Sequence, residues 1–244
     1  MQPTVLPLVL ISGHSRGLGR ALTEHYLARG CRVVGLSRRS LPPHPALRQY
    51  ALDLSDTAAV SAWMADSLPN ELADARDIIL INNAAMVAPN ALLGRQHPQD
   101  IAAAVALNIG APLLLSNGVL AYRPTAAALR ILHISSGAAR KDYPGWSVYG
   151  ATKAALDHHA RCVAAEAHPL LKIASIAPGV VDTEMQAEIR QADQQDFPLL
   201  PRFEELHRQQ ALSKPEQVAA ALAAYLDADT FGHSAVVDIR DEAV

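Results

Sequence analysis

The chain has 244 residues, half of them hydrophobic and 18% charged, with a formal net charge of −3. This length and composition are typical of one globular α/β domain, a class that commonly runs to about 200–250 residues. The slightly acidic balance and the lack of a polybasic stretch argue against a nucleic-acid-binding protein and against attachment to an anionic membrane.

Three further features bear on the compartment. Cys31 and Cys162 are too few for a disulfide framework or a metal cluster, and both lie in apolar periodic segments, so we expect buried, reduced thiols. The apolar start, residues 1–11, has no preceding positive charge and no small-residue cleavage site, which indicates a strand rather than a signal peptide. No apolar run approaches the roughly 18 residues of a membrane helix. We therefore expect a cytoplasmic protein that does not enter a membrane.

Short runs rich in Val, Ile and Leu alternate along the chain with longer segments of helical period. The short runs are continuously apolar, as parallel strands covered on both faces are. We predict strands over 5–12, 32–37, 48–52, 77–82, 129–135, 172–177 and 235–239, and helices over 17–29, 56–67, 100–121, 147–167 and 215–226. Asp56 and Ser147 are suited to N-cap positions and Pro215 to a first helical turn. The alternation predicts a Rossmann-type α/β fold, a doubly wound parallel β-sheet with helices on both faces, as one domain over 1–244.

One polar stretch, residues 183–213, interrupts this alternation between the sixth strand and the last helix. An excursion of that length is usually a functional lid or a mobile loop, and otherwise a surface insertion without function. Its apolar side chains, Phe197, Leu199, Leu200 and Phe203, suit an apolar substrate, a core contact or a subunit interface equally well. We predict that the stretch covers the substrate.

A glycine-rich turn, Gly13-His14-Ser15-Arg16-Gly17-Leu18-Gly19, joins the first strand to the first helix. Glycines allow a tight turn and close backbone approach to a pyrophosphate, which the helix N-terminus attracts through its unpaired N–H groups. We expect the His14 side chain to face solvent. Three glycines can be ordinary loop residues, but their place between a strand and a helix predicts a dinucleotide site.

The second strand ends in Ser37-Arg38-Arg39, where a cofactor with a free ribose 2′-hydroxyl commonly meets an Asp or Glu. A guanidinium suits a 2′-phosphate through charge-assisted hydrogen bonds, and Arg16 can add a second contact. The arginines are otherwise a solvated pair. The missing acid and the two bases together favour NADP(H) over NAD(H).

Tyr149 and Lys153 lie four residues apart in a predicted helix, so their side chains share one face. An ammonium beside a phenol lowers the phenol's pKa from about 10 towards neutrality, as a general acid requires. The same spacing also occurs on the solvated edge of an ordinary helix. The pair is therefore a candidate proton-transfer site.

Together these motifs resemble the short-chain dehydrogenase/reductase family over nearly the whole chain. The family's glycine turn matches Gly13, Gly17 and Gly19, and its Tyr-x-x-x-Lys pair matches Tyr149 and Lys153. By the same resemblance, the catalytic serine falls on Ser136, thirteen residues before the tyrosine, and the fourth site residue on Asn108. Further family positions fall on Asp53 and Leu54, on Asn83, Ala84 and Ala85, and on Pro178, Gly179, Val181 and Thr183.

The resemblance implies roles for these residues. Ser136 would orient a substrate oxygen, Tyr149 would act as general acid or base, and Lys153 would bind the nicotinamide ribose and lower the phenol's pKa. Asn108 would support a proton relay through water. The cofactor-binding residues would be Gly13, Ser15, Arg16, Gly17, Leu18, Gly19, Ser37, Arg38, Arg39, Asp53, Leu54, Asn83, Ala84, Ala85, Tyr149, Lys153, Pro178, Gly179, Val181 and Thr183.

The sequence departs from the family pattern in two places. Ala85 replaces the usual glycine of Asn-Asn-Ala-Gly, which reduces backbone freedom without removing a reacting group. The tail lacks the common Thr-Gly-Gln and Asp-Gly-Gly signature. Its Val-Asp-x-x-Asp form at 237–241 is similar to the sepiapterin reductase and benzil reductase branch.

The activity implied is reduction of a small-molecule carbonyl, or oxidation of the alcohol, with NADP(H). A non-catalytic dinucleotide sensor or scaffold is the main alternative, since fold does not dictate function. An epimerase or dehydratase would usually carry a longer C-terminal substrate domain. None of the ten histidines shows metal-ligand spacing, so we expect no metal. By resemblance the helices over 100–121 and 147–167 would pair between subunits of a homodimer or homotetramer.

Overall fold

The computed structural model describes residues 6–241, so the predicted strand start at residue 5 lies outside the described residues. Seven strands form one sheet in the order β3-β2-β1-β4-β5-β6-β7, and every pairing is parallel. The strands are β1 Leu8–Ser12, β2 Arg32–Ser37, β3 Leu47–Ala51, β4 Asp77–Asn82, β5 Ala128–Ile134, β6 Leu171–Ala177 and β7 Val236–Asp238. The predicted Rossmann-type sheet is confirmed.

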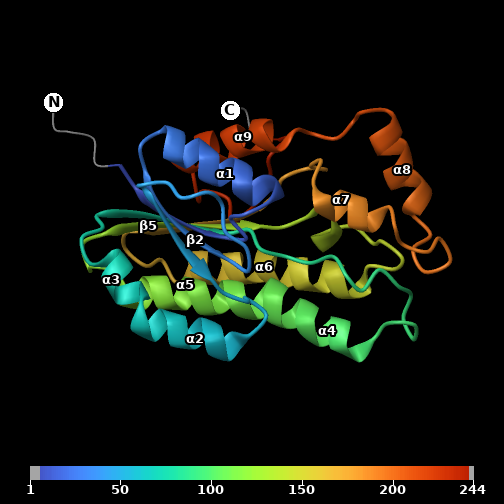
Figure 1. Cartoon of the computed structure of the whole chain (residues 1–244), viewed down its shortest axis with the longest axis horizontal. Coiled ribbons are helices and arrows are strands. Elements are labelled where there is room, and N and C mark those ends of the chain that lie inside the picture. Colours follow the sequence, from blue (N-terminus) through green and yellow to red (C-terminus); the bar gives the residue numbers. More distant parts are fainter. Residues whose placement is uncertain (1–5, 242–244) are drawn as a thin grey trace.

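Helices cover both faces of this sheet (Figure 1). On one face lie α1 (Gly17–Ala28) and α9 (Pro215–Asp227), and on the other lie α2 (Thr57–Asp66), α3 (Leu68–Leu72), α5 (Ala111–Tyr122) and α6 (Ser147–Ala165). Along β1, Val9 and Ile11 join the apolar core beneath α1 and α9, while Leu8 and Leu10 join the core on the opposite face. This two-sided burial explains why the strands read as continuous apolar runs.

The predicted helix over 100–121 is part of a longer helical stretch, Pro98–Tyr122. It consists of α4 (Pro98–Val105), a π-helical turn Ala106–Gly110 and α5. By length and composition alone this stretch could cross a membrane, so the prediction that no apolar run approaches that length was wrong. Leu115 and Val119 are fully buried against the sheet, which is the packing of a core helix in a layered fold.

The stretch over 183–213 contains two helices, α7 (Glu184–Ile189) and α8 (Leu200–Arg208). They lie together at one end of the molecule, beyond the end of α1 (Figure 1). Phe197, Leu200 and Phe203 are buried in a separate apolar cluster with Trp146. Phe197 and Leu200 thus make core contacts, and Phe203 both joins this core and lines the cavity described below.

Local predictions had mixed outcomes. Asp56 caps α2 by accepting hydrogen bonds from the N–H groups of Ala58 and Ala59, as predicted. Ser147 is the first residue of α6 rather than its N-cap, and its hydroxyl accepts a hydrogen bond from Gln96 instead. Cys31 is buried, but Cys162 is exposed, because its position on α6 faces away from the sheet. The prediction of a buried thiol at Cys162 was wrong.

Candidate active site

A cavity of about 550 Å³ opens where the glycine turn, the residues after β5 and β6, and helices α6 to α8 meet. This is the carboxyl edge of a parallel sheet, where α/β folds bind ligands. The predicted residues that line it are Arg16, Gly17, Leu18, Asn83, Ala85, Ser136, Tyr149, Lys153, Pro178, Gly179, Val181 and Thr183. The other predicted residues lie behind or beside this lining, as described next.

The glycine turn has the shape that a phosphate cradle needs. Gly13 has a φ of +70°, and a Cβ on Gly19 would stand 2.1 Å from the carbonyl oxygen of Gly13. Only glycine fits such a closed turn. α1 then begins at Gly17 with no side-chain cap and no acidic residue in its first turn. Its first N–H groups are left for a ligand, so the residues present fit a dinucleotide pyrophosphate.

We expected the His14 side chain to face solvent, and this prediction was wrong. Its ring is fully buried beneath the turn. Nδ1 lies 3.0 Å from the Ser37 hydroxyl and Nε2 lies 2.8 Å from Oε1 of Gln49. The ring occupies the space over Gly35, where a Cβ would meet it at 2.4 Å. Burial lowers the pKa of His14, which favours a neutral ring. In the sequence, the glycine at position 35 inside the apolar second strand was the available signal that another group packs against this point of the strand.

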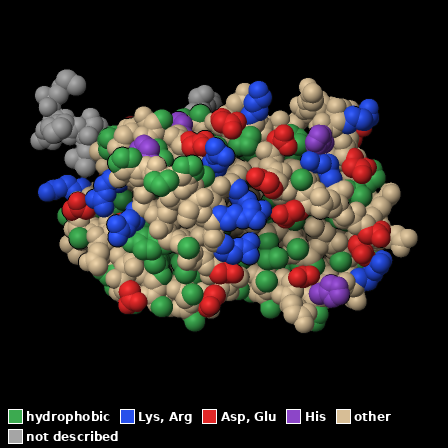
Figure 2. Space-filling model, viewed as in Figure 1, with side chains coloured by type: hydrophobic (Ala, Val, Ile, Leu, Met, Phe, Trp, Pro, Cys, Tyr) green, Lys and Arg blue, Asp and Glu red, His purple; other side chains and the backbone are tan. Residues whose placement is uncertain are grey.

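The end of β2 carries the predicted arginines. The Ser37 hydroxyl, in contact with His14, Ser15 and the backbone of Arg39, ties the glycine turn to this strand end. Arg38 and Arg39 are both exposed, and within residues 6–241 neither forms an ion pair. On the face shown in Figure 2, positive side chains gather close to one end of α1, with acidic ones beside them.

The remaining predicted cofactor residues lie around this edge without lining the cavity. Hydrogen bonds from Ser55, with a smaller contribution from Arg38, lower the pKa of Asp53. Leu54 is buried in the core, and Ala84 is partly buried and packs against that core. The Ser12 hydroxyl accepts hydrogen bonds from the N–H groups of Asn83 and Ala84, and so joins the ends of β1 and β4.

Helix α6 presents Tyr149 and Lys153 to the cavity on one face, as their spacing predicts. Both are nearly fully buried, at 7% and 3% exposed. The ammonium of Lys153 lies 5.8 Å from the centroid of the Tyr149 ring and donates a hydrogen bond of 2.7 Å to the carbonyl of Ile134. Ser136, at the start of a short 3₁₀ turn after β5, hydrogen-bonds to Tyr149 and accepts a bond from the N–H of Ala138. All three side chains line the same cavity.

Burial, rather than the neighbouring ammonium, dominates the protonation of this group. Burial raises the pKa of Tyr149, and the Ser136 hydrogen bond opposes that shift. Burial also lowers the pKa of Lys153 to about 8, against the attraction of Asp157. In this structure burial outweighs the lowering of the phenol's pKa that we expected from Lys153. At neutral pH the phenol of Tyr149 therefore holds its proton.

Asn108 lies in the π-helical turn and is 1% exposed. Its side-chain oxygen accepts from the N–H of Met86 at 2.9 Å, and its nitrogen donates to the carbonyl of Met86 at 2.8 Å and to the Thr152 hydroxyl at 3.1 Å. Thr152 precedes Lys153 on α6. Asn108 thus fixes the chain after β4 against the helix that carries Tyr149 and Lys153. Its part in a proton relay stays a prediction.

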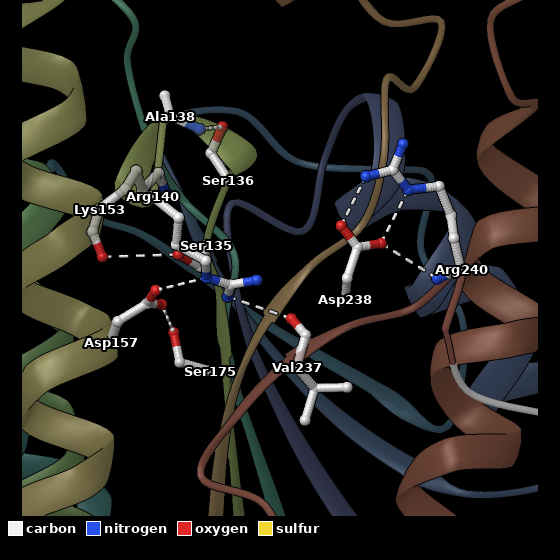
Figure 3. Close-up of polar contacts among 10 residues, drawn as sticks. All are labelled: Ser135, Ser136, Ala138, Arg140, Lys153, Asp157, Ser175, Val237, Asp238 and Arg240. Carbon is white, nitrogen blue, oxygen red and sulfur yellow. Dashed lines mark hydrogen bonds and ion pairs between the residues drawn. The ribbon is translucent and has the colours of Figure 1, made fainter. Parts of the chain in front are cut away.

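A polar network that the sequence reasoning missed lies beside Lys153 (Figure 3). Asp157, 3% exposed, accepts a hydrogen bond of 2.9 Å from Arg140 and one of 2.7 Å from the Ser175 hydroxyl. Arg140 also donates to the carbonyl of Val237, so it joins α6 to the last strand. Asp157 follows Lys153 by four residues on the same helix face, which was the available signal.

The other end of the cavity is aromatic. The ring of Trp146 lies 5.2 Å from that of Tyr149, 5.5 Å from Tyr143 and 5.1 Å from Phe203, centroid to centroid. Gln186 of α7 also lines the cavity. Its side-chain oxygen is buried and has no hydrogen-bond partner among the described residues, so a ligand N–H or O–H would suit it.

Comparisons with known proteins agree with this geometry. The family model for short chain dehydrogenases matches residues 7–194. A benzil reductase ((S)-benzoin forming) from Bacillus cereus is 33% identical over 96% of this chain and 99% of its own, and a sepiapterin reductase from Meriones unguiculatus is 31% identical over 95% of each. A solved short-chain dehydrogenase/reductase from Burkholderia vietnamiensis is 38% identical, with a TM-score of 0.69 over 98% of this chain and 100% of that one. The resemblance to the family, and to these two reductases within it, is confirmed.

Proposed function

Because this chain belongs to the short-chain dehydrogenase/reductase family of oxidoreductases, which use nicotinamide dinucleotides, we propose that it reduces a small-molecule carbonyl to an alcohol with NADPH. The observation that carries the proposal is one cavity lined by Ser136, Tyr149 and Lys153 and by the uncapped start of α1. The two reductase relatives support the carbonyl substrate class.

The protein's own part in the reaction is orientation and proton handling. The bound dinucleotide supplies the hydride. Ser136 accepts a hydrogen bond from Ala138 and hydrogen-bonds to Tyr149, so its hydroxyl lies beside the phenol, where it can donate to the same substrate oxygen. Tyr149 donates its proton to that oxygen as negative charge develops there.

Lys153 supports this proton transfer. One of its three N–H groups is bound to the carbonyl of Ile134. Within residues 6–241 the other two have no hydrogen-bond partner, so they can hold the hydroxyls of the nicotinamide ribose. With a pKa of about 8 it is mostly charged at neutral pH, so it stabilises the tyrosinate left after the transfer.

The Tyr149→Phe variant tests the reaction. We expect kcat to fall by at least about 100-fold, because the general acid is removed, while the Kd for NADPH stays near the wild-type value. The measurement is NADPH oxidation with a panel of aromatic diketones, pterins and simple ketones. Tyr143→Phe, which alters another phenol in the same cavity, is the matched control and should keep its turnover.

Two results would contradict the proposal. Turnover by Tyr149→Phe at the wild-type rate would remove the catalytic role of the phenol. Tight NADPH binding by the wild-type protein, with no turnover across the panel, would instead favour a dinucleotide sensor.

The preference for NADP(H) is tested by Arg38→Asp. Arg38 and Arg39 are exposed at the end of β2 and form no ion pair within residues 6–241, so they are available to a 2′-phosphate. We expect the Kd for NADPH to rise about tenfold or more and the Kd for NADH to change little. The control is Arg76→Asp, directly before the start of β4, which makes the same charge change. It should leave the Kd values for NADPH and NADH unchanged. An equal loss for both dinucleotides in Arg38→Asp would overturn this preference.

A further inference from the structure

The positive side chains that line the cavity fall into two groups. Six of them are described: Arg16, Arg140, Lys141, Lys153, Arg202 and Arg240. Three are paired with acids of the chain itself, Arg16 with Glu188, Arg140 with Asp157 and Arg240 with Asp238. Lys153 is held by the carbonyl of Ile134 and lies near Asp157. Only Lys141 and Arg202 have no acidic partner in the described part of the chain.

These two cations lie at the aromatic end of the cavity. The guanidinium carbon of Arg202, on α8, stands 5.7 Å from the centroid of the Tyr143 ring, and Lys141 precedes Tyr143 by two residues. From Tyr143 the rings continue through Trp146 to Tyr149 in steps of 5.5 and 5.2 Å. The glycine turn and the arginines of β2 belong to other parts of the site. Arg202 therefore lies at the aromatic end of the cavity, with Tyr143, rather than in the glycine turn.

The arrangement selects a particular ligand chemistry. The rings of Trp146 and Phe203, together with Met185 and Ile189, form an apolar wall that suits a flat aromatic body. A guanidinium held beside an aromatic ring by a cation–π contact keeps N–H groups open, and these match a carboxylate in a bidentate pair.

We propose that the substrate is an aromatic keto acid, with its carbonyl at Ser136 and Tyr149 and its carboxylate at Arg202. Lys141 adds a second positive charge at the same end. The rings of Tyr143 and Trp146 lie between Arg202 and Tyr149, which leaves room for an aromatic body between the carbonyl and the carboxylate. This inference rests on the proposed carbonyl reductase function and names the substrate class of that site.

The test is a matched pair of probes, 4-acetylbenzoate and its methyl ester, which differ only in the negative charge. Binding to the NADP⁺-loaded protein is followed by quenching of tryptophan fluorescence, since Trp146 lies in the wall. We expect the acid to bind about tenfold more tightly than the ester at low ionic strength. In Arg202→Met the two affinities should become nearly equal, and Arg202→Lys should keep part of the preference. Arg208→Met, which removes an exposed arginine from the same helix, should keep all of it.

Binding and turnover together separate this inference from the proposed reaction. Equal binding of acid and ester by the wild-type protein, or an unchanged preference in Arg202→Met, would overturn the keto-acid assignment even if the ester is reduced. A rise in the Kd for NADPH in Arg202→Met, of the same size as the loss for the acid, would also overturn it, because Arg202 would then bind the cofactor. A preference that is lost in Arg202→Met, without reduction of either probe, would support the anion site and count against the reductase.

Discussion

His133 lies fully buried on β5, within a chain of polar side chains. Its Nδ1 is 3.1 Å from Nδ2 of Asn82, and its Nε2 is 3.0 Å from Nδ1 of His159 on α6. With Nδ1 accepting from Asn82, Nε2 carries the ring proton and donates to His159. Burial, with smaller repulsion from His159 and Lys153, lowers the pKa of His133 from 6.5 to about 3. The folded protein therefore holds this ring neutral.

This burial predicts a loss of stability in acid. In the unfolded chain His133 takes up a proton below pH 6.5, whereas in the folded chain it does so only near pH 3. The free energy of unfolding therefore falls as the pH drops through that window, by up to about 1.4 kcal/mol per pH unit from this group. In His133→Gln we expect a shallower dependence in urea titrations between pH 6.5 and 4. The exposed His168→Gln is the control, and a slope unchanged in His133→Gln would contradict the prediction.

The residue scale also shows what a sequence can predict. The spacing of Tyr149 and Lys153 correctly predicts a shared helix face, because helix geometry is local. The rise in the pKa of Tyr149 was not predicted, since its burial depends on Trp146 and on the α7 and α8 segment packed over it. The prediction that His14 faces solvent was wrong for the same reason, because its burial depends on the space left by Gly35 on the neighbouring strand.

At the level of elements, the π-helical turn Ala106–Gly110 is the least regular part of the site. The turn brings Asn108 against the backbone of Met86 and the hydroxyl of Thr152. The amide of Asn108 is buried there. A family match identifies Asn108, but not the irregular helix around it. Helical periodicity predicts only the continuous helix.

Asn108→Ala should therefore act first on stability. The change leaves the N–H and carbonyl of Met86 without their partner, and we expect the free energy of unfolding to fall by about 3 kcal/mol. Urea unfolding measures this loss, and the exposed Asn117→Ala on α5 is the control. A variant with unchanged stability and reduced kcat would show instead that Asn108 acts on the proton transfer alone.

The helices α7 and α8 show why element prediction fails over 183–213. They have six and nine residues, with Pro198 between them and Pro201 in the first turn of α8. Helices this short have little stability of their own. What fixes them is the contact of Phe197 and Phe203 with Trp146, which lies some 50 residues earlier in the chain. Such a contact leaves no periodic signal in the local sequence.

For the molecule as a whole, the order of the strands decides where the site lies. Connections run outward from β1 through β2 to β3, then return to β4 and continue on the other side. A crevice forms where the direction reverses, at the carboxyl ends of β1 and β4. The glycine turn after β1 and Asn83 after β4 meet there, linked by a hydrogen bond of 3.0 Å from Asn83 to the carbonyl of Ser12. The regular alternation of strands and helices was enough to predict this arrangement.

The outer surface of the molecule leads to a prediction about assembly. Ile101, Val105 and Ile109 follow one another at helical spacing on the Pro98–Tyr122 stretch, and all three are at least partly exposed. Val105 is 45% exposed, so an aspartate there remains in water and should not unfold the monomer. An apolar stripe of this kind is typical of a surface that packs against a second subunit.

We expect the wild-type chain to elute as a multiple of 26.0 kDa in size-exclusion chromatography with light scattering. Val105→Asp should shift the mass towards one chain, because a charge placed in an apolar interface loses its hydration without gaining a partner. Circular dichroism and NADPH binding should stay unchanged and so separate dissociation from unfolding. Leu93→Asp provides the matched control, since Leu93 is 87% exposed on the loop before α4. A wild-type monomer, or a Val105→Asp oligomer of wild-type mass, would rule out an interface at this stripe.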